Sequence, residues 1–332
     1  MNRKHLPPAI LLVILVSGCT SSETTVEFGN GVIVKEYGPE FSDVYSGECV
    51  DFNILIKNTG SVDAEKVFAE LLGLDQDWYD NDEISWGKGC TSSGGGPWVN
   101  REKVSNEQGC RYTSGGRDLL APDAMWGVDG ETMICSWTYM APKLPEHMTI
   151  DYYPTARVFY TYHTDVSREI TLMSSQEMRD YVNSNTPLPT DTQVSTHAPI
   201  QIDVVAATPL RVFSDRVEFP IEIRINNVGG GVACIGSSRW DDVSSCKTHD
   251  ASETWNKLKL EVKSGNYIDV SSDCRDIDIT LYKGKDNTIR CDATVSISSL
   301  PASRTKDIIE VKAYYNYFLD QEMEITVHGS IE

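Results

Sequence analysis

The stretch Val50-Asp51-Phe52-Asn53-Ile54-Leu55-Ile56-Lys57-Asn58-Thr59-Gly60 decides the fold. Large apolar side chains stand at every second position from Val50 to Ile56. Successive side chains of a β-strand point to opposite faces, so this pattern predicts a strand with one buried and one exposed face. Asn58 and Gly60 tolerate positive φ and predict a turn directly after it.

Similar alternation recurs along the chain. It is found at Phe219–Ile225, Cys135–Tyr139, Cys291–Ile297, Val158–Tyr162 and Ala313–Tyr317, with short closing strands expected at 169–172 and 324–327. Long helical periods are absent from the sequence. Short alternating strands separated by turns favour antiparallel sandwiches. The predicted fold is therefore all-β, with two tandem immunoglobulin-like antiparallel β-sandwiches.

An internal repeat of roughly 155 residues accounts for the number of domains. Arg157-Val158-Phe159-Tyr160-Thr161-Tyr162 aligns with Lys312-Ala313-Tyr314-Tyr315-Asn316-Tyr317. The ungapped alignment continues to Asp165 with Asp320, and the turn at Asn58-Thr59-Gly60 corresponds to Asn227-Val228-Gly229. Cys90 followed by Trp98 resembles Cys246 followed by Trp255. The period is too long for a solenoid, so we expect two duplicated domains.

These observations predict the following organisation: a signal peptide at 1–18, a flexible tether at 19–27, a first β-sandwich with a Cys/Trp-rich insertion at 28–173, a linker at 174–198 and a second β-sandwich at 199–332. Within the linker, residues 177–182 predict a short helix. The stretch that follows is rich in Pro, Thr and Ser and shows no apolar period.

The N-terminus predicts export and lipid attachment. Basic residues at positions 3–5 precede the apolar run at 9–16, and Gly18-Cys19 follows. This is the layout of an export signal, too short to span a bilayer as a helix. The cysteine at the predicted cleavage site of the signal peptide resembles the lipobox of prokaryotic lipoproteins. This resemblance implies that Cys19 carries a lipid. An uncleaved or plainly secreted signal with an incidental cysteine is the alternative.

The remaining eight cysteines predict disulfides, because an even number in an exported chain favours bridges in an oxidising compartment. They are Cys49, Cys90, Cys110, Cys135, Cys234, Cys246, Cys274 and Cys291. We favour the pairs Cys90–Cys110, Cys234–Cys246, Cys49–Cys135 and Cys274–Cys291. Other pairings stay open, because four cysteines in each half allow three arrangements.

The insertion between residues 78 and 126 has two interpretations. Aromatic rings on disulfide-held loops offer large apolar area at little entropic cost, which suits a binding face. The candidate binding residues are Trp86, Trp98 and Trp126. Alternatively, the rings cover the edge of the sandwich. The acidic stretch at 75–83 could bind calcium, but it lacks the spacing of an EF-hand, and a solvated loop is the favoured interpretation.

Composition and motifs argue against several functions. The formal charge of −20 and the lack of a basic run disfavour nucleic acid. The sequence contains no GxSxG, HExxH, phosphate-binding or dinucleotide motif, and its histidines are dispersed. His163 aligns with Phe318, which predicts a packing position. We therefore expect a non-enzyme with no cofactor and no metal; an extracytoplasmic hydrolase is the least favoured alternative.

The strand ending Ile56-Lys57-Asn58-Thr59-Gly60, followed by Val62-Asp63-Ala64, resembles the CARDB-type immunoglobulin-like domains of archaeal and bacterial surface proteins. The resemblance covers about twenty residues of each domain. It implies a surface protein, with a leaning toward archaea, and carries no activity. The expected function is non-catalytic binding or scaffolding on the extracytoplasmic face of the membrane, with an envelope protein or polysaccharide as partner. Glycan binding through the Trp-rich insertion is the alternative.

Overall fold

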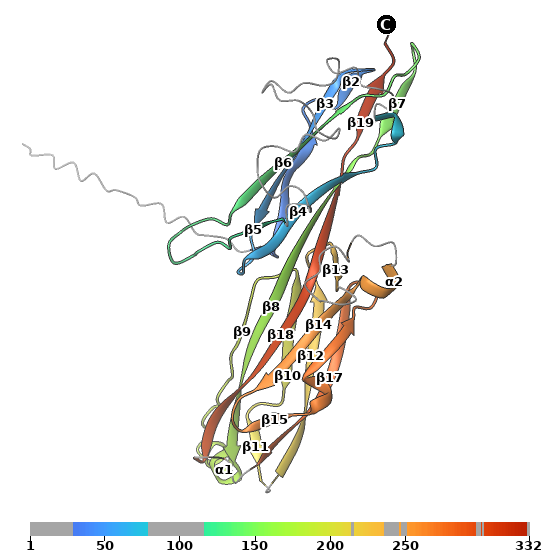
Figure 1. Cartoon of the computed structure of the whole chain (residues 1–332). Helices are drawn as coiled ribbons and strands as arrows, with labels where there is room; N and C mark the ends of the chain where they lie inside the picture. Colours follow the sequence, from blue (N-terminus) through green and yellow to red (C-terminus); the bar gives the residue numbers. More distant parts are fainter. Residues whose placement is uncertain are drawn as a thin grey trace, which may run out of the picture.

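The computed structural model describes residues 29–78, 116–213, 216–235, 246, 251–296, 300 and 302–330. These residues form an elongated all-β molecule in which two sandwiches lie end to end (Figure 1). The predicted all-β class is therefore confirmed. Cys19, Trp86 and Trp98, which the sequence singles out, lie outside the described residues.

The first sandwich combines a three-stranded sheet with one end of a larger sheet. The small sheet has the order β1-β3-β6, formed by Val32–Pro39, Cys49–Asn58 and Thr132–Met140. Opposite it lie β4 (Ala64–Leu72), β5 (Arg117–Leu119) and the first part of β8 (Thr155–Ser174). A further sheet at the far end has the order β2-β19-β7, formed by Asp43–Tyr45, Ile325–His328 and Thr149–Tyr152.

The second sandwich pairs a four-stranded sheet with the other end of the large sheet. The four-stranded sheet has the order β10-β12-β17-β15, formed by Ile200–Ala206, Arg216–Asn227, Asp286–Ser296 and Ile268–Val270. The large sheet continues through β18 (Arg304–Glu322), β14 (Lys257–Ser264) and β16 (Asp276–Thr280). Other elements are β9 (Gln193–Ser195), β11 (Leu210–Val212), β13 (Val232–Cys234), α1 (Ser175–Asn183), α2 (Ala251–Thr254), η1 (Gln76–Trp78) and η4 (Ser272–Cys274).

The predicted alternation is confirmed by burial. On β3 and β12 the apolar residues at every second position are buried, and they join one continuous core with their partners from the facing sheets. The same holds for the buried aromatic residues Tyr160, Tyr162, Tyr315 and Tyr317. Burying one large apolar side chain stabilises a fold by about 1.5–3 kcal/mol, so these stripes explain why the strands pack as they do.

Two long strands join the sandwiches. β8 and β18 pair in antiparallel register over nearly their whole length, from Arg304 opposite Met173 to Glu322 opposite Thr155. Both strands run from one sandwich into the other (Figure 1). The expected short strand at 169–172 is wrong as a separate element, because the strand continues from the aromatic segment without interruption. Its repeat equivalent at 324–327 is separate and forms β19.

This pairing exchanges strands between the halves of the sequence. Immunoglobulin-like sandwiches place strands A, B, E and D in one sheet and C, F and G in the other. The orders β1-β3-β6 against β4-β8-β18, and β10-β12-β17-β15 against β14-β18-β8, follow that arrangement. In each sandwich, the strand in the G position comes from the other half. The boundary at 174–198 stays a prediction; α1 and β9 lie within it, and β9 pairs with β8.

The repeat and the ladder together define a local two-fold axis. The repeat aligns Thr161 with Asn316, and the same two residues lie opposite each other in the ladder. Both are buried, and the Thr161 hydroxyl donates to the Asn316 side-chain oxygen at 2.7 Å. On either side of this pair, Tyr160 faces Tyr317 and Tyr162 faces Tyr315. The duplicated halves are therefore related by an axis through the middle of the shared ladder.

The two Asn-x-Gly turns are held by the amide of their asparagine. The Asn58 amide donates to the carbonyl oxygens of Val62 and Leu119, both at 2.9 Å. The Asn227 amide donates to the carbonyl oxygens of Gly231 at 2.8 Å and Gly284 at 2.9 Å. Equivalent bonds in both halves explain why the sequence repeats this turn.

A tyrosine of the central ladder completes each turn. The Tyr162 hydroxyl donates to the Val62 carbonyl at 3.0 Å, and the Tyr317 hydroxyl donates to the Asn227 side chain at 2.5 Å. Tyr162 and Tyr317 are repeat equivalents. Each sandwich therefore ties its first turn to the strand pair that joins the two halves.

Two predicted disulfides are confirmed and one is wrong. Cys234–Cys246 and Cys274–Cys291 are bonded, with Cα atoms 5.8 and 5.9 Å apart. Cys49 of β3 lies opposite Met140 of β6. Cys135 of β6 lies opposite Ile54, which is five residues further along β3 than Cys49. That offset is about 17 Å, and a disulfide needs Cα atoms within about 7 Å. Cys49 and Cys135 are each disulfide-bonded, though not to one another. Cys90 and Cys110 lie outside the described residues.

The expected match between Cys90–Trp98 and Cys246–Trp255 is also wrong. Phe159 and Tyr314 are repeat equivalents, and they pair with β4 and β14, so these two strands correspond. The segment with Cys246 and Trp255 precedes β14, whereas Cys90 and Trp98 follow β4 in the sequence. The two insertions therefore occupy different places in the duplicated sandwich.

Shortening the chain tests whether its end belongs to the first sandwich. Ending it at Met323 removes β19, whose Ile325 and Val327 are fully buried. Loss of that burial should lower the free energy of unfolding by about 3–6 kcal/mol. We expect fast amide hydrogen exchange in β2 and β7, which pair with β19, and a smaller loss of protection in β12 and β17. A chain ending at His328 is the control. Slow exchange in β2 and β7 after removal of β19 would contradict this arrangement.

Candidate binding site

A groove of about 620 Å³ crosses the outer face of the large sheet in the second sandwich. It spans β14, β18, β8 and β9 in that order. Buried valines such as Val166 and Val311 alternate with the outward residues, so the same strands form the core on one side and the groove on the other. Its polar lining consists of Ser61, Asp165, Ser167, Ser195, Thr196, His197, Glu261, Lys263, Glu310, Lys312 and Tyr314.

The centre of the groove is a row of alternating charges. The register places Glu261 opposite Lys312, and Lys312 opposite Asp165. The Lys312 ammonium lies 3.3 Å from the Asp165 carboxylate, and the Lys263 ammonium lies 2.8 Å from the Glu261 carboxylate. The hydrogen bond to Glu261 raises the pKa of Lys263, so that side chain stays charged. Oppositely charged cross-strand neighbours also stabilise the sheet.

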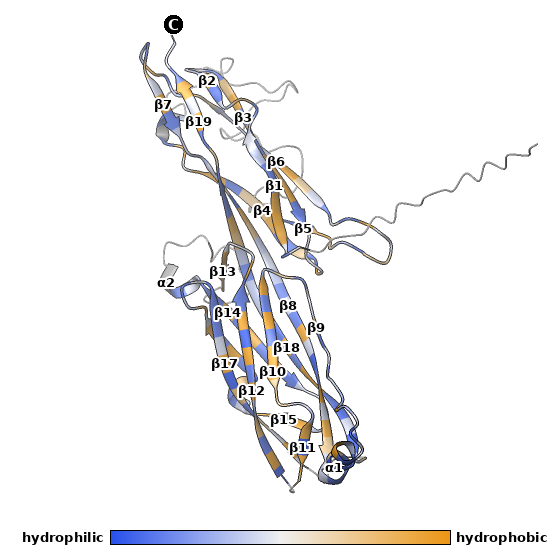
Figure 2. Ribbon diagram, turned by 180° about the vertical axis from the view of Figure 1, so that it is seen from behind, coloured by the Kyte–Doolittle hydropathy of each residue, from blue (hydrophilic) through white to orange (hydrophobic). Residues whose placement is uncertain are grey.

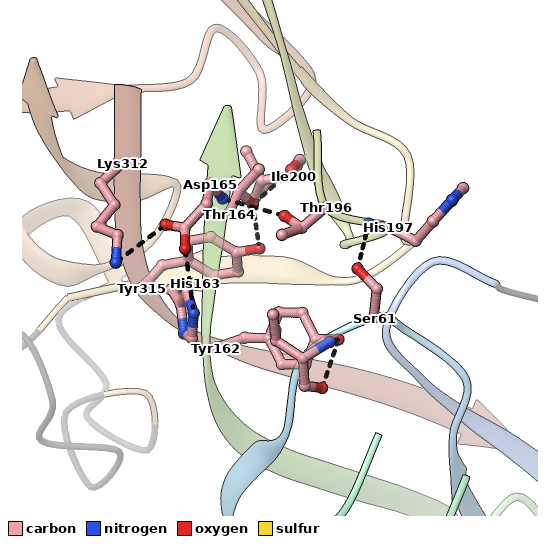
Figure 3. A network of polar contacts seen from close by, with 11 residues as sticks. Ser61, Tyr162, His163, Thr164, Asp165, Thr196, His197, Ile200, Lys312 and Tyr315 are labelled. Atoms are coloured by element: carbon pink, nitrogen blue, oxygen red, sulfur yellow. Dashed lines mark hydrogen bonds and ion pairs between the residues drawn. The ribbon is translucent and has the colours of Figure 1, made fainter. Parts of the chain in front are cut away.

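One wall of the groove is fixed to the first sandwich. The His197 backbone N–H donates to the Ser61 hydroxyl at 2.7 Å, and the Ser61 N–H donates to the His197 carbonyl at 3.0 Å. The Asp165 N–H donates to the Thr196 hydroxyl at 3.0 Å. Figure 3 shows this wall beside the Asp165–Lys312 pair. Residues from both halves of the sequence therefore shape the groove.

The local two-fold axis relates the groove to a second ion pair. Arg157 and Lys312 are repeat equivalents, as are Asp320 and Asp165. Arg157 makes two hydrogen bonds to Asp320, both 2.6 Å long. An equivalent ion pair between β8 and β18 therefore occurs once in each sandwich.

Aromatic side chains contact the cation of both ion pairs, but more closely in the Arg157–Asp320 pair. The centroid of the Phe318 ring lies 4.4 Å from the Arg157 guanidinium. Trp255 packs on Phe318, with ring centroids 5.1 Å apart. The Lys312 ammonium lies 5.8 Å from the centroid of the Tyr314 ring. The Lys312 side chain is 42% exposed in the groove, compared with 20% for Arg157, so a partner could reach Lys312.

His163 differs from the expectation of a packing position. Its side chain is 32% exposed at the edge of the groove, and its imidazole lies 3.7 Å from the Asp165 carboxylate. Its repeat equivalent, Phe318, is buried. Alternation on β8 identifies the outward face, but only the register brings His163 next to Tyr314 on β18.

The sequence alone does not identify the charged residues of β14 and β18 as part of a site. Their alternating charges are also typical of a solvated sheet, so no local signal sets them apart. The pairing of β14 with β18, and of β18 with β8, is what brings them into one row.

The other predicted site residues have different outcomes. Trp126 is exposed, on the loop between β5 and β6. Asp75 precedes η1 and Asp77 lies within it, and the Asp77 N–H donates to the Asp75 carboxylate at 3.2 Å. Residues 79–83 lie outside the described residues. Among the described residues, no group of three or more His, Cys, Asp or Glu side chains could hold a metal ion. No helix in that part of the chain is long and apolar enough to cross a membrane.

No protein-family model and no curated protein matches the chain. Among solved structures, the chain is similar to the Enterococcus faecalis MSCRAMM ACE, described as binding its ligands by the collagen hug model. The identity is 8%, the TM-score 0.17, and the match covers 92% of this chain and 98% of that one. The collagen adhesin CNA of S. aureus matches with 10% identity and a TM-score of 0.11, covering 89% and 92%. Similarity at these TM-scores carries no argument about function.

The buried tyrosines of the β8–β18 ladder predict a loss of stability at high pH. Burial raises the pKa of Tyr160 and Tyr315 well above the usual value and raises that of Tyr317 to about 12. Tyrosines ionise near pH 10 in the unfolded chain, so this contribution to stability is complete below about pH 10 and is lost as the pH rises toward the folded values. The free energy of unfolding should fall by up to about 1.4 kcal/mol per pH unit for each tyrosine. Denaturant titrations between about pH 8 and 11.5 measure this slope.

The variant Tyr317→Phe is the matched control, because it removes one titrating group from the ladder. Its slope above about pH 10 should be shallower than that of the unmodified protein. A free energy of unfolding that stays level across the same range would contradict the assignment of these tyrosines.

Proposed function

We propose that this protein is a lipid-anchored, non-catalytic binding protein on the extracytoplasmic face of the membrane. In this proposal, Cys19 carries the lipid and the groove between β14 and β9 holds a segment of an envelope protein. The groove is the observation that carries the proposal. The surface context implied by the CARDB-type resemblance, with its leaning toward archaea, belongs to the same proposal.

The lining of the groove favours a protein partner. Three carboxylates and two lysine ammonium groups lie among serine and threonine hydroxyls, and Tyr314 adds an aromatic surface. A peptide segment that carries both signs of charge complements such a row, and electrostatic complementarity confers specificity and fast association. Nucleic acid does not fit, because its phosphates would meet a chain with a formal charge of −20.

The joint between the sandwiches supports a role in display. The β8–β18 ladder, its buried tyrosines and the contacts between Ser61 and His197 tie the groove wall to both halves. A preformed site loses less conformational entropy on binding. Glycan binding through Trp86, Trp98 and Trp126 remains the second prediction; of these three residues, the exposed Trp126 supports it.

A charge reversal in the groove tests the partner site. Lys312→Glu places a carboxylate beside Asp165 and Glu261, so we expect at least about a tenfold loss of partner capture. Quantitative cross-linking from native membranes measures the capture. Lys285→Glu is the control, because this exposed lysine lies in the turn before β17, outside the groove lining. Equal capture by both variants would contradict a binding role for the groove.

Intact-mass analysis of the native protein tests the anchor. We expect a mature chain that begins at Cys19 and carries added lipid mass, because the thiol follows the apolar run and small residues of an export signal. Cys19→Ser should abolish the added mass and release the protein from membranes. A native protein that retains its leader, or that lacks lipid, would contradict the anchor while leaving the groove proposal open to its own test.

A further inference from the structure

The loop between β5 and β6 exposes a cluster of large apolar side chains. In this Trp126 hairpin (residues 120–131), Met125 is 87% exposed and Trp126 is 77% exposed. Leu120 and Val128 are 59% and 55% exposed. Packing of the hydrophobic core does not require apolar side chains at these exposed positions. An exposed apolar cluster typically marks an interaction site.

The tip of the hairpin is preorganised. Asp123 and Val128 exchange two backbone hydrogen bonds, at 2.8 and 2.9 Å. The Asp123 carboxylate accepts from the N–H groups of Met125 at 2.9 Å and Trp126 at 3.2 Å. Gly127 has a φ of 64°, which a residue with a side chain rarely adopts. The turn therefore satisfies these polar groups internally while it holds both large side chains outward.

The hairpin lies close to Gly29, which follows the predicted tether. The Asn58 N–H donates to the Glu131 carbonyl at 3.0 Å, and the Gly29 N–H donates to the Thr59 carbonyl at 2.8 Å. The base of the hairpin and Gly29 thus contact the same turn. In Figures 1 and 2, which view the molecule from opposite sides, the loop between β5 and β6 projects sideways near the junction of the sandwiches.

We propose that the Trp126 hairpin contacts the surface of the lipid bilayer and orients the anchored protein. This inference rests on the proposed lipid at Cys19. Gly29 follows Cys19 by ten residues, and an extended chain of that length spans at most about 35 Å. The anchor therefore keeps the hairpin near the membrane. Tryptophan favours the membrane–water interface, where its apolar ring and its N–H are both accommodated.

The charges near the tip permit this contact. Asp129 is paired with Lys57 at 2.9 Å, and Arg117 is paired with Glu131 at the base. The Asp123 carboxylate is occupied by the backbone of the turn. The bilayer is favoured over a protein or glycan partner because the apolar groups project at the end of a narrow hairpin close to the anchored end of the chain.

The test uses the chain from Thr20, with an N-terminal hexahistidine tag bound to nickel-chelating lipid in phosphatidylcholine vesicles. Vesicles with brominated acyl chains quench tryptophans that reach the interface, and vesicles with ordinary acyl chains give the baseline. We expect quenching in the unmodified protein and its loss in Trp126→Phe. Trp255→Phe, in the second sandwich, should retain the quenching. The tag replaces the natural lipid, so the result does not depend on the outcome at Cys19.

A second variant, Met125→Ser, leaves every tryptophan in place and should also reduce the quenching, since both side chains share the tip. Equal quenching in the unmodified protein and in Trp126→Phe would overturn the proposal. So would unquenched emission from the tethered protein, which would point to a protein or glycan as the occupant of the hairpin.

Discussion

The antiparallel ladder between β8 and β18 is the interaction on which the rest of the molecule depends. It supplies the G-position strand of both sandwiches, buries the tyrosines of the joint and carries the central charges of the groove. Hydrogen bonds of this kind each contribute only about 0.5–1.5 kcal/mol, but here their geometry couples two cores. Neither half of the sequence completes its own sandwich, so we infer that the two halves fold as one unit.

The sequence predicts the strands well and the connections between them poorly. Alternation on β3 and β12 is a local property, and burial confirms it. The continuation of β8 past Tyr162 cannot be predicted locally, because the largely polar stretch at 163–168 resembles a turn between two strands. The error at Cys49–Cys135 has the same origin: both residues lie on neighbouring strands, but only the register shows how far apart they are along them.

The groove shows the same limit. Each of its charged residues belongs to an ordinary alternating strand, and a solvated face would look identical in the sequence. What distinguishes the groove is its wall, formed where His197 and Ser61 bind each other across a long stretch of sequence. Trp126 was identifiable from the sequence as an aromatic residue in a glycine-containing loop, whereas its exposure depends on how Asp123 closes the turn.

The Thr161–Asn316 pair has a consequence for the history of the chain. In a symmetric pair of identical subunits, a residue on the axis would face its own copy, and the two sides could not be assigned different chemistry. With threonine opposite asparagine, the two sides have different hydrogen-bonding roles: the Thr161 hydroxyl donates and the Asn316 amide oxygen accepts. A fused pair of halves is free to differ at its axis, and in this protein that freedom lies at the centre of the molecule.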